Sequence, residues 1–198
     1  MRIGIYGGVF DPVHLGHLNI ARRAHDFAGL DRLYFVPTNI PPHKNLPLET
    51  IEHRINMVLL IINQESRFFY LSRFEESERT SFTFETIDKF KSEFPHDEIF
   101  YLIGADSLYL IKYWKNYKKF LKHVKLLVAP RPGQEINLDL VEKEISEKVE
   151  IITDLNEINI SSTDIRNMIK TGDKNLRNFL SDEVYDYIIK NELYSHIR

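Results

Sequence analysis

Two histidines three residues apart lie in a segment that could bind a phosphate. His14 and His17 belong to GGVFDPVHLGHLNI, which follows an apolar run at Arg2–Tyr6. Glycines let a ligand approach the main chain, and a helix that begins after them offers free N–H groups and the positive end of its dipole. Residues at i and i+3 share one face of a helix, so both imidazoles are expected to donate to one anion. Gly16 leaves space between the rings.

Other interpretations of this pair are weaker. The stretch is neither a GxGxxG dinucleotide fingerprint nor a P-loop, which would end in Gly-Lys-Ser or Gly-Lys-Thr. A zinc site would favour HExxH spacing or cysteine, and the chain has no cysteine. Surface polarity explains most histidine pairs, but not one placed after a strand and a glycine turn. The stretch therefore favours phosphoryl or nucleotidyl transfer, in which catalysis is mostly positioning and charge neutralisation.

A second candidate for phosphate binding lies near the C-terminus. The segment ISSTDIR runs from Ile160 to Arg166. Ser161 or Ser162 is expected to cap a helix whose free N–H groups can meet phosphates. Arg166 follows one turn later and can reach a phosphate with its guanidinium. Taken alone, the segment is a capped helix.

Composition sets the class of protein. The 198 residues suit one ordinary domain, and 43% hydrophobic residues can build a sizeable core. The net charge of -3 does not favour a general nucleic-acid binder. The absence of cysteine fits a reducing compartment and excludes disulfides. A strand that begins at residue 2 leaves no room for a signal peptide, and no apolar run reaches the ~18 residues of a membrane span. We expect a soluble cytoplasmic protein, with self-association left open.

The elements that position these residues follow from the hydrophobic pattern. Strands are predicted at Arg2–Tyr6, Arg32–Val36, Phe68–Leu71, Ile99–Ile103, Lys125–Ala129 and Val149–Thr153. Helices are predicted between them at Leu15–Ala28, Thr50–Gln64, Thr83–Phe94, Ser107–Lys122 and Leu138–Lys148. Apolar strands that alternate with helices indicate an α/β fold: a doubly wound parallel sheet with helices on both faces.

The pattern changes after Thr153. Helices are predicted at Ser161–Lys170 and Ser181–Asn191. We expect one domain over residues 1–198, in which residues 154–198 form a C-terminal helical subregion packed on the sheet edge. The proline-rich segment Pro37–Leu48 predicts a loop at the carboxyl end of the second strand, where open α/β sheets hold their ligands.

Five further residues are candidates for binding, each with a plain structural alternative. Lys44 in PPHK can contact a phosphate or simply face solvent. Thr83 in SFTFETI and Asp106 in IGADSL can bind a ligand or cap a helix. Trp114 can stack on a flat ring or fill the core. Arg131 in RPG can face a ligand or belong to a generic turn.

A lysine-rich run, KYWKNYKKFLKHVK, extends from Lys112 to Lys125. It predicts a solvated helix face above buried aromatic side chains. The alternative, RNA binding, would give an RNA affinity that falls steeply with salt.

The motifs together resemble a known family. GGVFDPVHLGHL resembles the signature of the HxGH nucleotidyltransferases, and the whole chain resembles the bacterial nicotinate-nucleotide adenylyltransferases from end to end. PPHK, SFTFETI, IGADSL, RPG and ISSTDIR all resemble segments of that family. The resemblance implies a Rossmann-like nucleotidyltransferase fold. It also implies transfer of AMP from ATP to nicotinate mononucleotide, giving nicotinate adenine dinucleotide and pyrophosphate. Mg²⁺ would be bound by the ATP phosphates, with no metal ligand directly from the protein.

The resemblance also assigns residues to ligands. Those assigned to ATP are Gly7, Gly8, Val9, Phe10, His14, His17, Gly104, Asp106, Ile160, Ser161, Ser162, Thr163 and Arg166. Those assigned to the nicotinate nucleotide are Lys44, Thr83, Trp114 and Arg131. The catalytic set, which neutralises charge on the triphosphate, is His14, His17, Lys44 and Arg166.

The sequence departs from the family at several positions. Val9 stands where the family has Thr or Ser, Phe82 replaces Tyr, Ser77 replaces an arginine, and Leu180–Asp182 replaces Val-Pro-Glu. Two alternatives therefore stay open. The acceptor could be nicotinamide mononucleotide or phosphopantetheine, or the chain could be a non-catalytic nucleotide-binding module.

Overall fold

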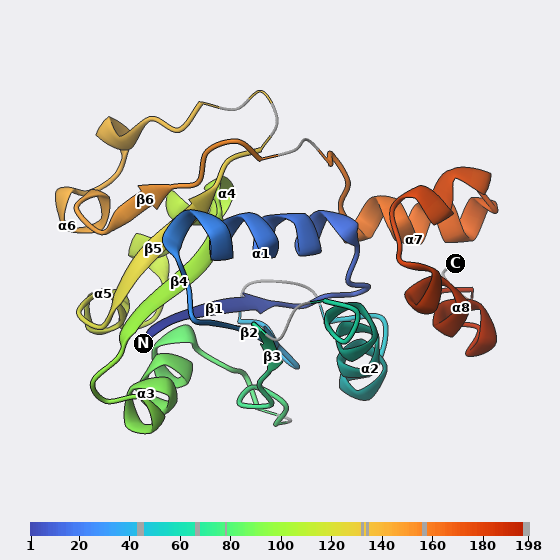
Figure 1. The fold of residues 1–198 in the computed structure, drawn as a ribbon, viewed down its shortest axis with the longest axis horizontal. Coiled ribbons are helices and arrows are strands. Elements are labelled where there is room, and N and C mark those ends of the chain that lie inside the picture. The colour runs from blue at the N-terminus through green and yellow to red at the C-terminus, as the bar shows by residue number, and fades with distance from the viewer. Residues whose placement is uncertain are drawn as a thin grey trace.

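The computed structural model describes residues 1–42, 46–65, 68–77, 79–131, 133, 135–155 and 158–195. Lys44, one of the predicted phosphate contacts, lies outside these residues. The six strands are β1 (Arg2–Gly8), β2 (Arg32–Pro37), β3 (Phe69–Leu71), β4 (Glu98–Gly104), β5 (Val124–Ala129) and β6 (Val149–Ile151). They form one sheet in the order β3-β2-β1-β4-β5-β6, and every pairing is parallel. The predicted doubly wound fold is confirmed (Figure 1).

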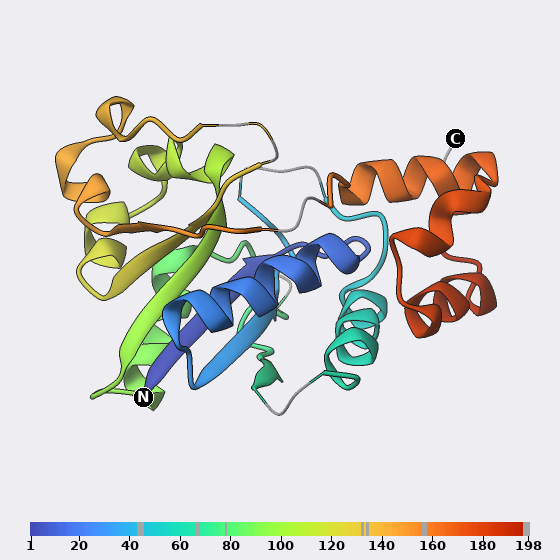
Figure 2. The ribbon, with the colours of Figure 1, turned by 45° about the horizontal axis from the view of Figure 1, so that its top comes forward.

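The sheet buries both faces because its strands alternate between two cores. In β1, Ile3 and Ile5 face one core, while Tyr6 belongs to the other. Helix α1 (Leu15–Ala28) contributes to the core of Tyr6, and α3 (Thr83–Glu93) contributes to the opposite core. Figure 2 shows α1 lying along the sheet next to β1. The strand order reverses at β1 and β4, which places a ligand site at their carboxyl ends.

The long amphipathic helices were predictable. Helix α1 has the predicted bounds and ends at Gly29, whose φ of 53° suits glycine. Helix α2 (Ile51–Ile62) begins after Thr50, whose hydroxyl accepts a hydrogen bond from the amide of His53.

Two predicted helices are wrong because short turns replace them. The segment Ser107–Lys122 divides into α4 (Ala105–Leu108), the 3₁₀ turn η1 (Ile111–Tyr113) and α5 (Tyr117–Leu121). Asn116 interrupts the segment with a left-handed φ of 54°. The segment Leu138–Lys148 divides into the 3₁₀ turn η2 (Leu138–Leu140) and α6 (Lys143–Ser146), because Val141 is extended and Glu142 is not helical. A helical spacing of apolar residues cannot reveal such backbone reversals.

The C-terminal subregion consists of α7 (Ser162–Thr171), the 3₁₀ turn η3 (Lys174–Asn178) and α8 (Asp182–Lys190). We expected this subregion to pack on the sheet edge. It lies instead beyond the carboxyl end of β1 and packs against α2 (Figures 1 and 2). Ile165, Val184 and Ile188 share a core with Met57 and Ile61 of α2. The apolar faces of α7 and α8 select this position because α2 presents a matching buried face.

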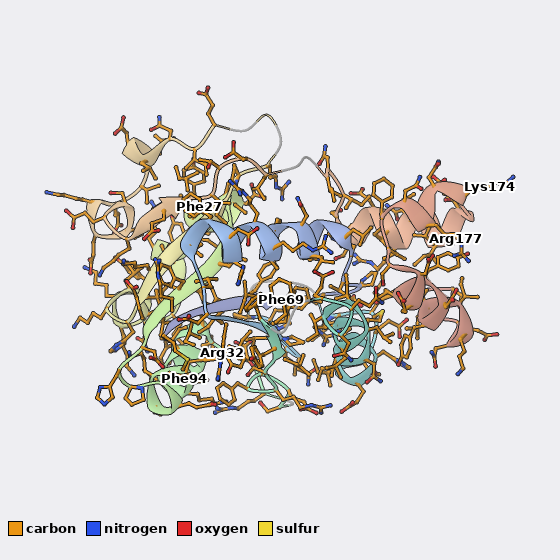
Figure 3. The ribbon with its side chains drawn as sticks, viewed as in Figure 1. Phe27, Arg32, Phe69, Phe94, Lys174 and Arg177 are labelled. Carbon is orange, nitrogen blue, oxygen red and sulfur yellow. The ribbon has the colours of Figure 1, made fainter. Side chains whose placement is uncertain are left out.

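Charged side chains mark the outer side of this subregion. Lys174 and Arg177 lie at the end remote from the sheet (Figure 3), and Arg177 pairs with Asp182 at 3.1 Å.

A buried arginine fixes the loops that follow β1 and β2. Arg54 of α2 is fully buried. Its Nη1 donates to the carbonyl oxygens of Val9 and Thr38, both at 2.7 Å, and its Nε donates to the carbonyl of Glu49 at 3.1 Å. Burial lowers the pKa of this guanidinium, and the charge of Asp11 opposes the shift. Arg54 thus sets the distance between the two loops that border the ligand site.

We predict that Arg54→Met lowers the free energy of unfolding by about 3 kcal/mol, because several buried carbonyls lose their donor. The control is Arg22→Met, which removes an exposed pair with Glu65 and should cost less than about 1 kcal/mol. Urea unfolding of the three proteins measures both values. Equal losses in the two variants would contradict the role of Arg54.

Candidate active site

Two adjoining cavities open at the carboxyl ends of the strands. The larger measures about 1030 Å³ and the smaller about 830 Å³. Gly104 and Arg131 line both of them. Their position at the reversal of strand order is the place where an open α/β sheet binds its ligands.

Most of the predicted site residues line these cavities. Those on the larger cavity are Gly7, Gly8, Val9, Phe10, His17, Thr83, Gly104, Asp106, Trp114, Arg131, Ser162, Thr163 and Arg166. Ile160 and Ser161 line the smaller cavity. His14 is buried beside His17. The structure therefore brings together segments from both ends of the chain, while their individual roles stay predictions.

The glycines after β1 leave room for neighbouring side chains. A Cβ atom on Gly7 would lie 2.5 Å from the hydroxyl of Tyr101, and one on Gly8 would lie 2.8 Å from the ring of Phe10. Phe10 itself is buried and has a left-handed φ of 51°, which is strained for a bulky residue. Its ring packs edge-on against Tyr6, with 5.5 Å between centroids. The loop is thus held in one shape by packing.

The two histidines lie together at the start of α1, as predicted. His14 is the N-cap residue, and its main-chain amide donates to Nδ1 of His17 at 3.3 Å. The ring centroids are 3.8 Å apart, with 34° between the planes. A Cβ on Gly16 would lie 2.9 Å from Nδ1 of His14, so Gly16 does provide the space that the sequence indicated.

His14 is a neutral group in the free protein. Its residue is 4% exposed, and burial lowers the pKa of its imidazole from 6.5 to about 4, although the charge of Asp164 opposes the shift. Among the described residues, its buried Nδ1 has no hydrogen-bond partner. Such an atom calls for a functional explanation, and at pH 7 the ring can offer a donor rather than a charge.

The ISSTDIR segment is bonded directly to the loop after β1. Ser161 caps α7 and forms a capping box with Asp164, which confirms the predicted cap. The hydroxyl of Ser162 donates to the carbonyl of Pro12 at 2.9 Å. Arg166 donates from Nη1 to the carbonyl of Asp11 at 2.7 Å and from Nη2 to the hydroxyl of Thr163 at 3.0 Å. Both predicted phosphate sites therefore face one cavity.

The opposite side of the larger cavity is aromatic and polar. Trp114 is partly buried, and its ring lies edge-on to Tyr101 at 6.2 Å. Thr83 is the first residue of α3 and not its cap, since Phe82 is the N-cap residue. Burial and the charge of Glu75 raise the pKa of Tyr101, whereas a hydrogen bond with Thr83 opposes the shift. An aromatic ring and hydroxyl groups thus line the same wall.

Asp106 and Arg131 form an ion pair where β4 and β5 end. Both side chains are exposed, so the pair is weakly held and either partner can turn to a ligand. Gly104 is the N-cap residue of α4, so Asp106 is not the cap.

Two buried carboxylates line the larger cavity and were not predicted from the sequence. Asp11 is 5% exposed and accepts hydrogen bonds from the Leu48 amide and the Tyr194 hydroxyl. Glu75 is equally buried and accepts from the hydroxyls of Thr38 and Thr86, and burial raises the pKa of its carboxyl. Asp11 belongs to the first motif, but its sequence context indicated only an Asp-Pro step and not a buried carboxylate. No local pattern marks Glu75.

One exposed carboxylate, that of Asp106, fits Mg²⁺ carried by a nucleotide. The described part of the chain contains no group of three or more His, Asp or Glu that could hold a metal ion. Asp11 and Glu75 are occupied by their donors, which leaves Asp106 as an exposed carboxylate on the larger cavity. Mg²⁺ is commonly bound through one or two carboxylates together with substrate phosphates.

The lysine-rich run is partly paired with acidic side chains of the same surface. Lys118 lies 3.4 Å from Glu144, and Lys119 pairs with Asp88. Phe120 and Leu121 are buried beneath them, which confirms a solvated face above apolar side chains.

The chain matches a family model and curated proteins. The family described as cytidylyltransferase-like matches residues 5–168. A protein of Clostridium tetani named "Probable nicotinate-nucleotide adenylyltransferase" is 37% identical over 96% of this chain and 97% of its own. A protein of Thermus thermophilus with the same name is also 37% identical, over 98% of this chain and 100% of its own.

Solved structures share the fold. The nicotinic acid mononucleotide adenylyltransferase of Plasmodium falciparum, complexed with NaAD, has a TM-score of 0.83 and 24% identity over 99% of this chain and 98% of its own. The same enzyme complexed with APC has a TM-score of 0.81. Separately, the described helices include none that is long and apolar enough to cross a membrane.

We predict that acid destabilises the protein through His14. The unfolded chain binds a proton near pH 6.5, but the folded ring does so only near pH 4, so stability falls as pH falls through this window. The loss should reach roughly 2–3 kcal/mol. Urea unfolding between pH 7 and pH 4.5 measures it, and His14→Gln should lose correspondingly less. Equal pH slopes in both proteins would contradict the shift.

Proposed function

The chain belongs to the nicotinate-nucleotide adenylyltransferase family, within the cytidylyltransferase-like proteins, and we propose that it transfers AMP from ATP to nicotinate mononucleotide. The products are nicotinate adenine dinucleotide and pyrophosphate. One observation of the structure carries the proposal. The histidine motif and the ISSTDIR segment meet at one cavity, where Ser162 and Arg166 are bonded to the loop after β1.

The reaction needs no protein nucleophile. A phosphate oxygen of nicotinate mononucleotide attacks the α-phosphorus of ATP in line, and the bond from that phosphorus to the β-phosphate oxygen breaks. Pyrophosphate leaves with the electron pair of the broken bond. The protein positions both phosphates and neutralises charge as it develops. His17 and Arg166 line the cavity and can donate to the triphosphate, while His14 supplies a neutral donor.

The two cavities suit two nucleotides. The smaller cavity, lined by Ile160, Ser161 and the apolar Ile136, suits the adenosine of ATP. The larger cavity takes the triphosphate beside His17 and Arg166, together with the nicotinate nucleotide. Gly104 and Arg131 line both cavities, which supports one ATP molecule extending from the smaller cavity into the larger.

The nicotinate end faces Trp114 and Thr83. The partly exposed indole offers a stacking surface for a pyridine ring. The start of α3 favours a carboxylate through its amides and the Thr83 hydroxyl. Arg131 can exchange Asp106 for a ligand, which leaves Asp106 for the ribose of ATP.

Mg²⁺, bound by the ATP phosphates on the cavity that the exposed carboxylate of Asp106 also lines, is the cofactor that we propose. When bound, it neutralises charge on the leaving pyrophosphate. We also propose a cytoplasmic location, which the cysteine-free composition fits. The acidic partners of Lys118 and Lys119 argue against a nucleic-acid partner.

We predict that pyrophosphate release with Mg-ATP is fastest with nicotinate mononucleotide. Its kcat/KM should exceed that of nicotinamide mononucleotide and of phosphopantetheine by about 10²-fold or more, since the site offers donors to the carboxylate. EDTA should abolish release, and added Mg²⁺ should restore it. Preference for another acceptor would keep the chemistry and overturn the substrate. A folded protein that binds ATP but releases no pyrophosphate with any acceptor would be a non-catalytic module.

We predict that His17→Ala lowers kcat by about 10²–10³, the scale for losing one transition-state donor. The control is His25→Ala, in the last turn of the same helix, which should keep the kcat of the wild type. Steady-state pyrophosphate release measures both. Near-wild-type turnover in His17→Ala would overturn its role.

A further inference from the structure

A buried carboxylate lies beside Arg166 without forming a close ion pair with it. Nη1 of Arg166 is 2.7 Å from the main-chain oxygen of Asp11 but 4.0 Å from its Oδ2. The Arg166 side chain is 22% exposed and lines the larger cavity, whereas that of Asp11 is 6% exposed. The guanidinium is thus anchored by neutral acceptors and keeps its charge available on the side of the cavity.

Three donors hold the Asp11 carboxylate away from Arg166. The Leu48 amide donates to Oδ2 at 2.8 Å, and the Glu49 amide donates to Oδ1 at 3.3 Å. The Tyr194 hydroxyl donates to Oδ1 at 2.9 Å. A carboxylate that accepts several hydrogen bonds gains less from a close cation than a bare one does.

Tyr194 is the donor that comes from outside the site. It lies near the C-terminus, is 2% exposed and has a left-handed φ of 62°. Its amide donates to Oε1 of Glu49 at 2.9 Å, so both its main chain and its side chain are fixed. Burial raises the pKa of the Tyr194 hydroxyl, which therefore stays a protonated donor.

We propose that Tyr194 is a positioning residue for the triphosphate: its hydroxyl holds the Asp11 carboxylate, and this leaves the charge of Arg166 to the ligand. The inference rests on the proposed function for the identity of the ligand. Without the hydroxyl, Oδ1 loses a donor and Asp11 competes with the phosphates for Arg166. The free protein would then hold Arg166 in an internal ion pair that the triphosphate must break.

Tyr194→Phe tests the proposal, because it removes only the hydroxyl. Its matched control is Tyr187→Phe. The Tyr187 hydroxyl accepts from Nδ2 of Asn56 at 3.1 Å and lies 3.0 Å from Nδ1 of His53. It also ties the C-terminal subregion to α2, but its hydrogen bonds do not include Asp11. Both variants lose one tyrosine hydroxyl of the C-terminal subregion, and thermal unfolding shows whether each is folded.

The readouts are the affinity for inorganic tripolyphosphate, by calorimetry on the full chain, and the KM values for both substrates. Tyr194→Phe should weaken tripolyphosphate binding about tenfold and raise the KM for Mg-ATP similarly, with the KM for nicotinate mononucleotide within about twofold of wild type. Tyr187→Phe should match the wild type in all three. Wild-type affinity in Tyr194→Phe, or equal losses in both variants, would overturn the proposal.

Asp11→Asn provides a second test that does not depend on Tyr194→Phe being folded. Removal of the carboxylate charge 4.0 Å from Arg166 should make tripolyphosphate bind about two- to fivefold more tightly than to wild type. Weaker binding would overturn the proposal. A wild-type protein without turnover would count against the proposed function alone, because tripolyphosphate binding still tests the link between Tyr194, Asp11 and Arg166.

Discussion

The buried guanidinium of Arg54 joins the loops that follow β1 and β2, and the shape of the site depends on it. A buried cation needs acceptors, and Arg54 takes them from the main chain after β1 and β2. Val9 contributes its carbonyl, so replacing the family's usual Thr or Ser leaves this bond intact. The same constraint joins α2 to both loops. Since α2 also packs against α8, the C-terminal subregion inherits its position from that helix.

Charge beside the loop after β1 is arranged around the buried carboxylate of Asp11. Two arginines, Arg54 and Arg166, lie near it, yet neither is bound to it through a close side-chain pair. Carbonyl oxygens hold both guanidinium groups, and neutral donors hold the carboxylate. This division fixes the loop after β1 and leaves the charge of Arg166 without a close carboxylate. The left-handed Phe10 fits the same picture, because tight packing on all sides sustains its strain.

A structural feature could be predicted from the sequence where the residues that determine it are close together in the chain. Helix α1, the parallel sheet and the Ser161 cap follow from periodicity, strand composition and capping chemistry, all of which act within a few residues. The breaks at Asn116 and Val141 were missed because apolar spacing says nothing of backbone handedness. Asp11, Glu75 and Tyr194 were missed for another reason. Their roles arise from partners distant in the chain, and burial of His14, which makes it neutral, appears only once the fold is assembled.

Solvent exposure separates the side chains of the site that can exchange partners from those whose partners are fixed. The buried groups Asp11, Glu75 and Arg54 have their hydrogen bonds satisfied in the free protein, and exchanging such partners would cost the full desolvation of each group. The exposed pair of Asp106 and Arg131 exchanges at little cost, since solvent already screens it. His14 stands apart as a buried ring whose Nδ1 has no partner among the described residues. Under the proposed function, a ligand meets these satisfied groups as a fixed frame and gains its contacts at Arg166 and at the exposed pair, which line the larger cavity.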